Sequence, residues 1–228
     1  MLTLCFCTTS LSAEPLKHAT LKPQIIEGWT VRVDEKLLSE DPEKTARILR
    51  NLRERLANIK IVIPQPHLAE LQKVKLVLEK KHPELKAMQY HPGVGWLKNK
   101  GYDETLVHCV HLPVADSLIA KRQISTQPWV ILHELAHAYH HQVLGFDHKE
   151  IIAAYEKFKT SGHGEKCLHY SGRRVQHYGL TNHKEFFAEM TEAYFGSNDF
   201  YPFNHGELKV AEPEIYKLIE KIWKPSKP

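Results

Sequence analysis

The segment His133-Glu134-Leu135-Ala136-His137 combines two histidines and a glutamate at a spacing that suits metal chemistry. On an α-helix, residues four apart project from one face about one turn apart, so both imidazoles can bind a single ion. Glu134 then lies within reach of a water rather than of the ion itself. Zinc lowers the pKa of such a water to about 7, and the glutamate accepts its proton as the water attacks a carbonyl. The spacing therefore predicts zinc held by His133 and His137, with Glu134 as general base.

The predicted helix around these residues is largely apolar, which favours a buried position. Apolar residues surround the histidines at Ile131, Leu132, Leu135, Ala136 and Ala138. Buried imidazoles and a buried carboxylate need polar partners, and a metal ion supplies them. The alternative is a pair of surface histidines on an amphipathic helix. Ser125-Thr126-Gln127-Pro128 indicates the start of the helix, and Gly145 indicates its end.

A third zinc ligand must come from elsewhere, because catalytic zinc sites have three protein ligands and an open position. The extended motif that would supply another histidine requires Gly and His at the positions where this chain has His140 and Val143. Glu185, in the segment 182–190, is therefore the predicted third ligand. His140 is the alternative ligand, because it shares a helix face with the two histidines of the motif.

Glu185 and Glu189 lie one turn apart on a second predicted helix, which begins after Asn182. Glu189 is predicted to accept a ring N–H from a zinc-bound histidine, which fixes the tautomer of that histidine. The alternative for Glu185 is a capping box, in which it pairs with Asn182 at the helix N-terminus. The residues between the two acids, Phe-Phe-Ala, indicate a mostly buried helix. Carboxylates without partners are costly there, which favours the ligand role.

Tyr178 is the candidate for stabilising negative charge during catalysis. A phenol O–H close to the metal can donate to the scissile carbonyl oxygen as charge builds on it. The alternative is a tyrosine packed at the end of a strand. Other histidines could line a cleft or occupy polar surface positions: His108, His111, His140, His141, His177 and His183.

Two blocks of this sequence together resemble a known family. Tyr178-Gly179-x-Thr181-Asn182-x-x-Glu185-Phe186-Phe187-Ala188-Glu189, downstream of the 133–137 motif, is similar to the catalytic domain of anthrax lethal factor. It is also similar to the wider group of secreted bacterial zinc peptidases that includes the Pro-Pro endopeptidases. The two blocks cover residues 127–205, about a third of the chain. The remaining two thirds resemble nothing in lethal factor, so the resemblance does not extend to its substrate.

The resemblance implies an α+β, zincin-like fold of gluzincin type, with a small sheet and an active-site helix. In that fold the metal ligands would be His133, His137 and Glu185, and the general base would be Glu134. Tyr178 would donate to the oxyanion, and Glu189 would support a ligand from behind. These roles are what the resemblance implies, and they agree with the chemistry expected from the residues themselves.

The composition excludes several other classes of protein. Hydrophobic residues make up 42% of the 228 residues and charged residues 25%, which is ordinary for a globular protein and unlike disordered or collagen-like chains. No apolar run approaches the roughly 18 residues of a membrane span. The net charge of +4 is spread along the chain, without a nucleic-acid-binding motif. We therefore expect a peptide or protein substrate, no nucleic acid and no membrane span, while the oligomeric state stays open.

The N-terminus suggests export. Residues 1–13 carry no charge and end in small residues, as in a secretory signal peptide, although a basic start is missing. We expect a secreted or periplasmic protein, with a frayed terminus on a cytoplasmic protein as the alternative. Cleavage would leave Cys109 and Cys167, which could pair or remain buried thiols.

Periodicity predicts one domain over residues 25–228, with a catalytic core at about 100–205, preceded by a linker at 14–24. The expected elements in chain order are a strand or hairpin at 25–33, a helix from Asp41-Pro42 to Ile59, a short strand Ile61–Ile63, a helix through Leu68–Leu78, turns at 88–100, a strand at 106–112 and a helix at 207–223. The strand portion 107–112 is the candidate for binding an extended peptide. The aromatic residues of 198–203 could wall a specificity pocket, and the alternative is that they only pack the end of the preceding helix.

These expectations together describe a zinc-dependent endopeptidase. A non-catalytic zinc-binding or adhesion domain with the same helices is the alternative, and it could bind metal without Glu134 or Tyr178. Hydrolysis of a non-peptide amide is a third possibility, because the same zinc chemistry permits it.

Overall fold

An antiparallel hairpin begins the part of the chain that the computed structural model describes, residues 19–225. Strand β1 (Leu21–Ile26) pairs with β2 (Trp29–Asp34), as the alternating pattern predicts. The turn Glu27-Gly28 has φ values of 51° and 96°, and two consecutive positive φ angles are typical of tight hairpin turns. Because β1 starts at Leu21, the linker predicted at 14–24 is wrong from that residue onward. The predicted signal segment 1–13 lies outside the described residues.

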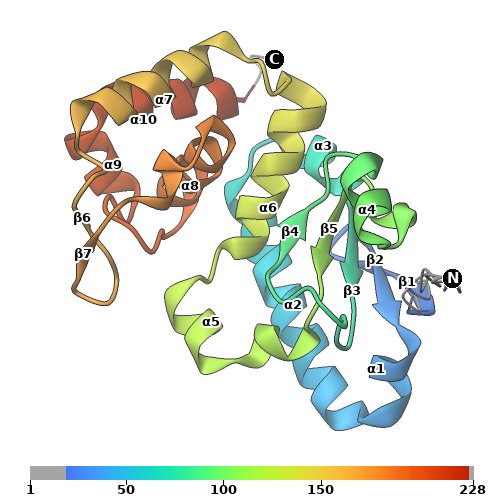
Figure 1. Ribbon diagram of the computed structural model, residues 1–228. Helices are drawn as coiled ribbons and strands as arrows, with labels where there is room; N and C mark the ends of the chain where they lie inside the picture. The colour runs from blue at the N-terminus through green and yellow to red at the C-terminus, as the bar shows by residue number, and fades with distance from the viewer. Residues whose placement is uncertain (1–18, 226–228) are drawn as a thin grey trace, which may run out of the picture.

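The hairpin belongs to a five-stranded mixed sheet with the order β1-β2-β3-β5-β4 (Figure 1). Strands β3 (Lys75–Leu78) and β5 (Cys109–Leu112) run parallel to β2 in the middle of the sheet. The two-residue strand β4 (Gln89–Tyr90) pairs antiparallel with β5 and forms an edge. The predicted strand at 106–112 is confirmed, but it starts later, at Cys109.

Helices connect β2 to β3: α1 (Glu35–Glu40), α2 (Pro42–Val62) and α3 (His67–Lys73). Asp41 caps α2 as predicted, because its side chain accepts from the backbone N–H of Lys44. The strand predicted at Ile61–Ile63 is wrong. Helix α2 continues through Val62, with Ile61 80% exposed and Ile63 buried one turn after Ile59. The predicted helix over Leu68–Leu78 is also wrong beyond Lys73, where the chain extends into β3.

Between β4 and the C-terminal third lie short helices, β5 and the helix α6 that carries the histidine motif. The helices are α4 (Val94–Lys100), η1 (Glu104–Leu106), η2 (Ala115–Ile119), α5 (Lys121–Thr126), α6 (Val130–Tyr139) and the π-helix η3 (His140–Leu144). The start signal at Ser125-Thr126 marks the end of α5 instead, because Pro128 cannot continue that helix. Gly145, with φ of 83°, follows η3 and ends the helical stretch as predicted.

The C-terminal third is mainly helical and lies on the far side of α6 from the sheet (Figure 1). Its elements are α7 (Lys149–Ser161), the hairpin β6 (Cys167–Leu168) and β7 (Arg174–Val175), η4 (Tyr178–Leu180), α8 (His183–Phe195), α9 (His205–Ala211) and α10 (Pro213–Trp223). The single helix predicted at 207–223 is two helices, divided at Glu212 before Pro213.

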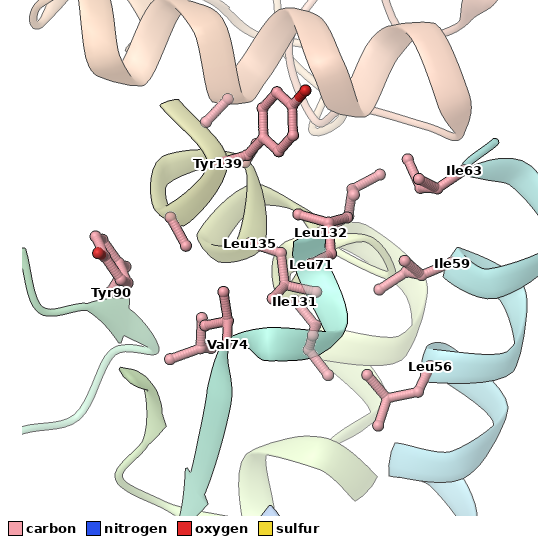
Figure 2. Close-up of a cluster of buried hydrophobic side chains, with 14 of the residues drawn as sticks. Leu56, Ile59, Ile63, Leu71, Val74, Tyr90, Ile131, Leu132, Leu135 and Tyr139 are labelled. Atoms are coloured by element: carbon pink, nitrogen blue, oxygen red, sulfur yellow. The ribbon is translucent and has the colours of Figure 1, made fainter. Parts of the chain in front are cut away.

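Helix α6 packs one face into the main hydrophobic core, between α2, α3 and the sheet. Figure 2 shows its side chains Ile131, Leu132 and Leu135 among residues from the neighbouring elements. Fully burying a side chain of this size stabilises a fold by about 1.5–3 kcal/mol. The core therefore fixes the orientation of α6, and with it the direction in which the opposite face points. The architecture is mixed α+β with a small sheet. None of the helices in residues 19–225 combines the length and the apolar character needed to cross a bilayer.

Candidate metal centre

Helix α6 directs His133 and His137 to the same side, away from the core. The imidazole centroids lie 4.7 Å apart, and His133 is buried with 7% exposure. The predicted consequence of the four-residue spacing is therefore present: two imidazoles one turn apart on one helix. The alternative of two surface histidines is wrong for His133.

Glu185 reaches both histidines from helix α8. Its Oε2 atom lies 3.1 Å from Nε2 of His133 and 3.2 Å from Nε2 of His137. Asn182 caps α8 by accepting from the backbone N–H groups of Lys184 and Glu185. The reciprocal half of a capping box is absent from the described residues, because the Glu185 carboxylate points to the histidines instead. Burial opposes ionisation of Glu185, but hydrogen bonds from the two histidines outweigh it and hold its pKa below the usual value.

The spacing of these three donor atoms fits a metal ion. Two ligands bound at about 2.0–2.1 Å in tetrahedral geometry stand roughly 3.3 Å from each other, close to the distances from Glu185 to each histidine. The three side chains form a buried group whose donor atoms all lie within 4.8 Å of one another. Two imidazoles and one carboxylate are a donor set that suits zinc.

Behind His133, the nearest carboxylate is Glu192 rather than the predicted Glu189. Oε1 of Glu192 lies 2.6 Å from Nδ1 of His133, whereas Oε1 of Glu189 lies 3.5 Å from that atom. Burial alone would lower the pKa of His133, but its hydrogen bonds with Glu185 and Glu192 raise it well above the usual value. Sequence reasoning missed Glu192, although it follows Glu185 by two helical turns on one face of α8.

Glu189 lies in the same buried region with less direct contacts. Its side chain is 3% exposed, and its Oε2 atom has no hydrogen-bond partner among the described residues. Nδ1 of His177 lies 3.9 Å from that oxygen. Glu189, Glu192 and His133 also form a second group whose donor atoms lie within 4.8 Å of one another.

Glu134 projects from α6 beside the two histidines and contacts the edge strand. Its Oε2 atom accepts a hydrogen bond of 2.7 Å from the backbone N–H of Tyr90 in β4. Burial raises the pKa of Glu134, and the nearby His133 and His137 and the Tyr90 N–H only partly offset that effect. The general base predicted from the motif is thus held between the histidines and β4.

Tyr178 faces the same site from η4. Its ring centroid lies 6.4 Å from that of His133, and its side chain is 48% exposed. Burial and the charge of Glu185 raise the pKa of the phenol, so it holds its proton at neutral pH. The alternative of a tyrosine packed at a strand end does not describe this position.

A cleft of about 820 Å³ gives access to these residues. Helices α6 and α8 form its floor and one wall, and the segment around β4 forms the other. Of the residues predicted to wall a pocket, Asp199 and Phe200 line this cleft. The prediction that the strand at 107–112 binds peptide is wrong, because β5 is paired on one side with β3 and on the other with β4. The free edge belongs to β4, a strand too short to show an alternating pattern.

No protein-family model, curated protein or solved structure matches this chain. The chemistry of the site is therefore argued from its own geometry and donor groups.

His140, the alternative ligand, lies outside both groups of possible metal ligands. It is fully buried against Phe146, Phe187 and His183, with ring centroids 5.0–5.7 Å away. The backbone N–H of His140 still donates to the carbonyl of Ala136, so this residue keeps its place in the helix. Its ring instead packs among these aromatic side chains, outside both groups of possible metal ligands. Burial lowers its pKa to about 3, and the neighbouring His183 adds to that effect.

Cys109 and Cys167 are both buried free thiols. They lie in β5 and β6, on opposite sides of α6 (Figure 1). The sequence left open whether these cysteines pair or remain buried thiols, and in the structure they are buried thiols.

Proposed function

We propose that this protein is a zinc-dependent endopeptidase with a zincin-like fold, related to the lethal factor catalytic domain. The observation that carries the proposal is the meeting of His133, His137 and Glu185 at one point beside Glu134. These residues come from two helices, α6 and α8, that are far apart in the sequence and meet only in the folded chain. Three ligands and an open side facing a cleft are the arrangement expected of a catalytic rather than a structural zinc site.

The position of β4 supports a peptide as the substrate. This strand is the edge of the sheet that borders the cleft next to α6, and the Tyr90 N–H on this edge contacts Glu134. An extended peptide can add to such an edge through main-chain hydrogen bonds. The cleft, with a volume of about 820 Å³, also has room for several residues of a peptide.

Each residue of the site has a defined task in the proposed reaction. Zinc, when bound, acts as a Lewis acid that polarises the scissile carbonyl and lowers the pKa of the attacking water. Glu134 accepts the proton from that water and delivers it to the leaving amine. Tyr178 donates its phenol proton in a hydrogen bond to the carbonyl oxygen as negative charge develops there. Glu192 accepts the Nδ1 proton of His133, which leaves the Nε2 lone pair directed at the metal position.

Cleavage of a mixed peptide library, with mass-spectrometric readout, tests this function. We expect internal cleavage by the purified chain, loss of cleavage after incubation with a chelator, and recovery on adding zinc. Cleavage that persists at full rate without metal would contradict the zinc mechanism. A protein that binds zinc but cuts no peptide would instead support the non-catalytic alternative.

A further inference from the structure

Three basic side chains line the cleft together with the candidate metal ligands: Lys86, Arg122 and Lys184. Lys86 and Arg122 are exposed, and Lys184 is half-buried. Within residues 19–225, none of the three forms an ion pair with a carboxylate. The Lys184 ammonium instead lies 4.2 Å from the centroid of the Phe146 ring. Cations that line a cleft without a counter-charge are available to a ligand.

The carboxylates of the cleft do not neutralise these cations. Glu134 and Glu185 belong to the reaction site itself. The other three are buried, with 3%, 6% and 9% exposure for Glu189, Glu192 and Asp199. Glu192 contacts His133, and Oδ2 of Asp199 accepts from Gln127 at 3.2 Å. Apart from Glu185, the charged side chains of the cleft that are not buried are therefore basic.

Arg122 and Lys184 mark opposite ends of the cleft. Arg122 lies on α5, just before the N-terminus of α6, while Lys184 lies over Phe146, which follows the C-terminal end of α6 and η3. Figure 1 shows α5 and the start of α7 beyond opposite ends of α6. Helix α6 has 10 residues, and a helix of that size is about 15 Å long. An extended peptide covers that length with about five residues.

We infer that the substrate is an acidic polypeptide segment, with aspartate or glutamate a few positions before and after the bond that is cut. This inference rests on the proposed endopeptidase function and adds its substrate class. Carboxylates on both flanks of the scissile bond would approach Arg122 at one end and Lys184 at the other. The net charge of +4 also favours approach of an acidic partner.

Binding can be separated from cleavage by measuring peptides on the Glu134→Gln protein loaded with zinc. The probes are a fluorescent peptide with two glutamates on each side of its centre, and matched peptides with glutamine or lysine at those positions. We expect the acidic peptide to bind about tenfold more tightly than the glutamine peptide at low salt. High salt should largely remove this preference, because it screens exposed charges.

Reversing the charge of Arg122 tests whether the preference for acidic peptides arises in the cleft. Arg122→Glu should weaken binding of the acidic peptide by about threefold to tenfold, since it replaces an attraction by a repulsion. It should leave the glutamine peptide nearly unchanged and improve the lysine peptide. Lys184→Gln should weaken the acidic peptide less, because it removes a charge without reversing it. Arg50→Glu, on the exposed side of α2 and outside the cleft, is the matched control and should change none of the three.

Equal binding of the acidic and glutamine peptides would overturn the inference. An Arg122→Glu protein indistinguishable from the Arg50→Glu control would do so as well. The same peptides assayed for cleavage by wild type distinguish the two levels of the argument. Cleavage without acidic preference would leave the endopeptidase function and remove its substrate class. Preferential binding of the acidic peptide, with no cleavage of any peptide, would keep the preference for acidic ligands and remove the endopeptidase function.

Discussion

Glu192 and Glu185, both on helix α8, contact the two ring nitrogens of His133. Oε1 of Glu192 lies 2.6 Å from Nδ1 of His133, and Oε2 of Glu185 lies 3.1 Å from Nε2 of the same ring. A histidine that donates its Nδ1 proton to a carboxylate presents an unprotonated Nε2, which is the atom that a metal requires. In the proposed zinc site, helix α8 would thus supply both a ligand and the group that orients another ligand.

We expect Glu192→Gln to weaken zinc binding by about 10–100-fold, because partners behind a metal-bound histidine typically contribute that much. Competition with a chromophoric chelator measures the affinity. Glu189→Gln is the matched comparison on the next turn of α8, and it should have the smaller effect because its oxygen lies 3.5 Å from Nδ1 of His133. A larger effect from Glu189→Gln would return the supporting role to that residue.

Glu185→Ala should abolish tight zinc binding, because it reduces three protein ligands to two. Elemental analysis of purified wild type and variant checks this, with about one zinc per chain expected for wild type. Glu156→Ala, an exposed position on α7, is the control and should retain the metal. Full zinc occupancy in Glu185→Ala at wild-type affinity would remove that residue from the ligand set.

Glu134→Gln should keep the metal and the fold but lose about 10²–10⁴ in the rate of peptide hydrolysis, the usual value of a positioned general base. The glutamine oxygen can still accept the Tyr90 N–H, so the geometry at β4 is preserved while the proton acceptor is lost. The measurement is kcat alongside zinc content. Equal rates for variant and wild type would show that another group activates the water.

Tyr178→Phe removes only the phenol hydroxyl. We expect a fall of about 10²–10³ in kcat with little change in KM, since an oxyanion donor acts in the transition state. Zinc content should stay at the wild-type level, because the ring lies beside His133 without being one of the ligands. A rise in KM at constant kcat would instead assign Tyr178 to substrate binding.

Local patterns in the sequence predicted the parts of the site that lie on one helix. The spacing of His133 and His137 needs only a regular helical turn, and α6 provides it. Asn182 and Glu185 were also readable, because a cap and a charged first turn define the start of α8. Glu192 was missed because its role depends on how α8 crosses α6, which is a property of tertiary packing.

Errors in the prediction came from local signals that longer-range structure overrides. The β-branched run Ile61-Val62-Ile63 suggested a strand, but burial of Ile63 one turn after Ile59 continues the helix. His140 was the alternative ligand because of its helical spacing, but its ring packs against Phe187 of α8 and lies outside both groups of possible metal ligands. No local pattern in the sequence predicts that packing. Strand β4 has two residues, and only its pairing with β5 defines it.

On the other face of the sheet, His91 belongs to a buried polar chain that ends at a carboxylate. Its Nε2 atom lies 3.3 Å from Nδ1 of His111, and Nε2 of His111 lies 3.2 Å from Oε1 of Glu79. His91 is 2% exposed and stacks on Trp96. Burial lowers the pKa of His91 to about 3, and the nearby His111 and His82 add to that effect.

This lowered pKa makes the fold sensitive to acid. His91 stays neutral in the folded protein down to about pH 3, while in the unfolded chain it takes up a proton near pH 6.5. Its contribution to stability is therefore complete above about pH 6.5 and is lost as the pH falls toward 3, at up to about 1.4 kcal/mol per pH unit. We expect His91→Gln to be less stable than wild type at pH 8 but to lose less stability between pH 6 and pH 4. Urea unfolding of both proteins across this range measures the difference, in which the contribution of the other histidines cancels. A pH dependence that is identical in the two proteins would show that His91 does not titrate in this window.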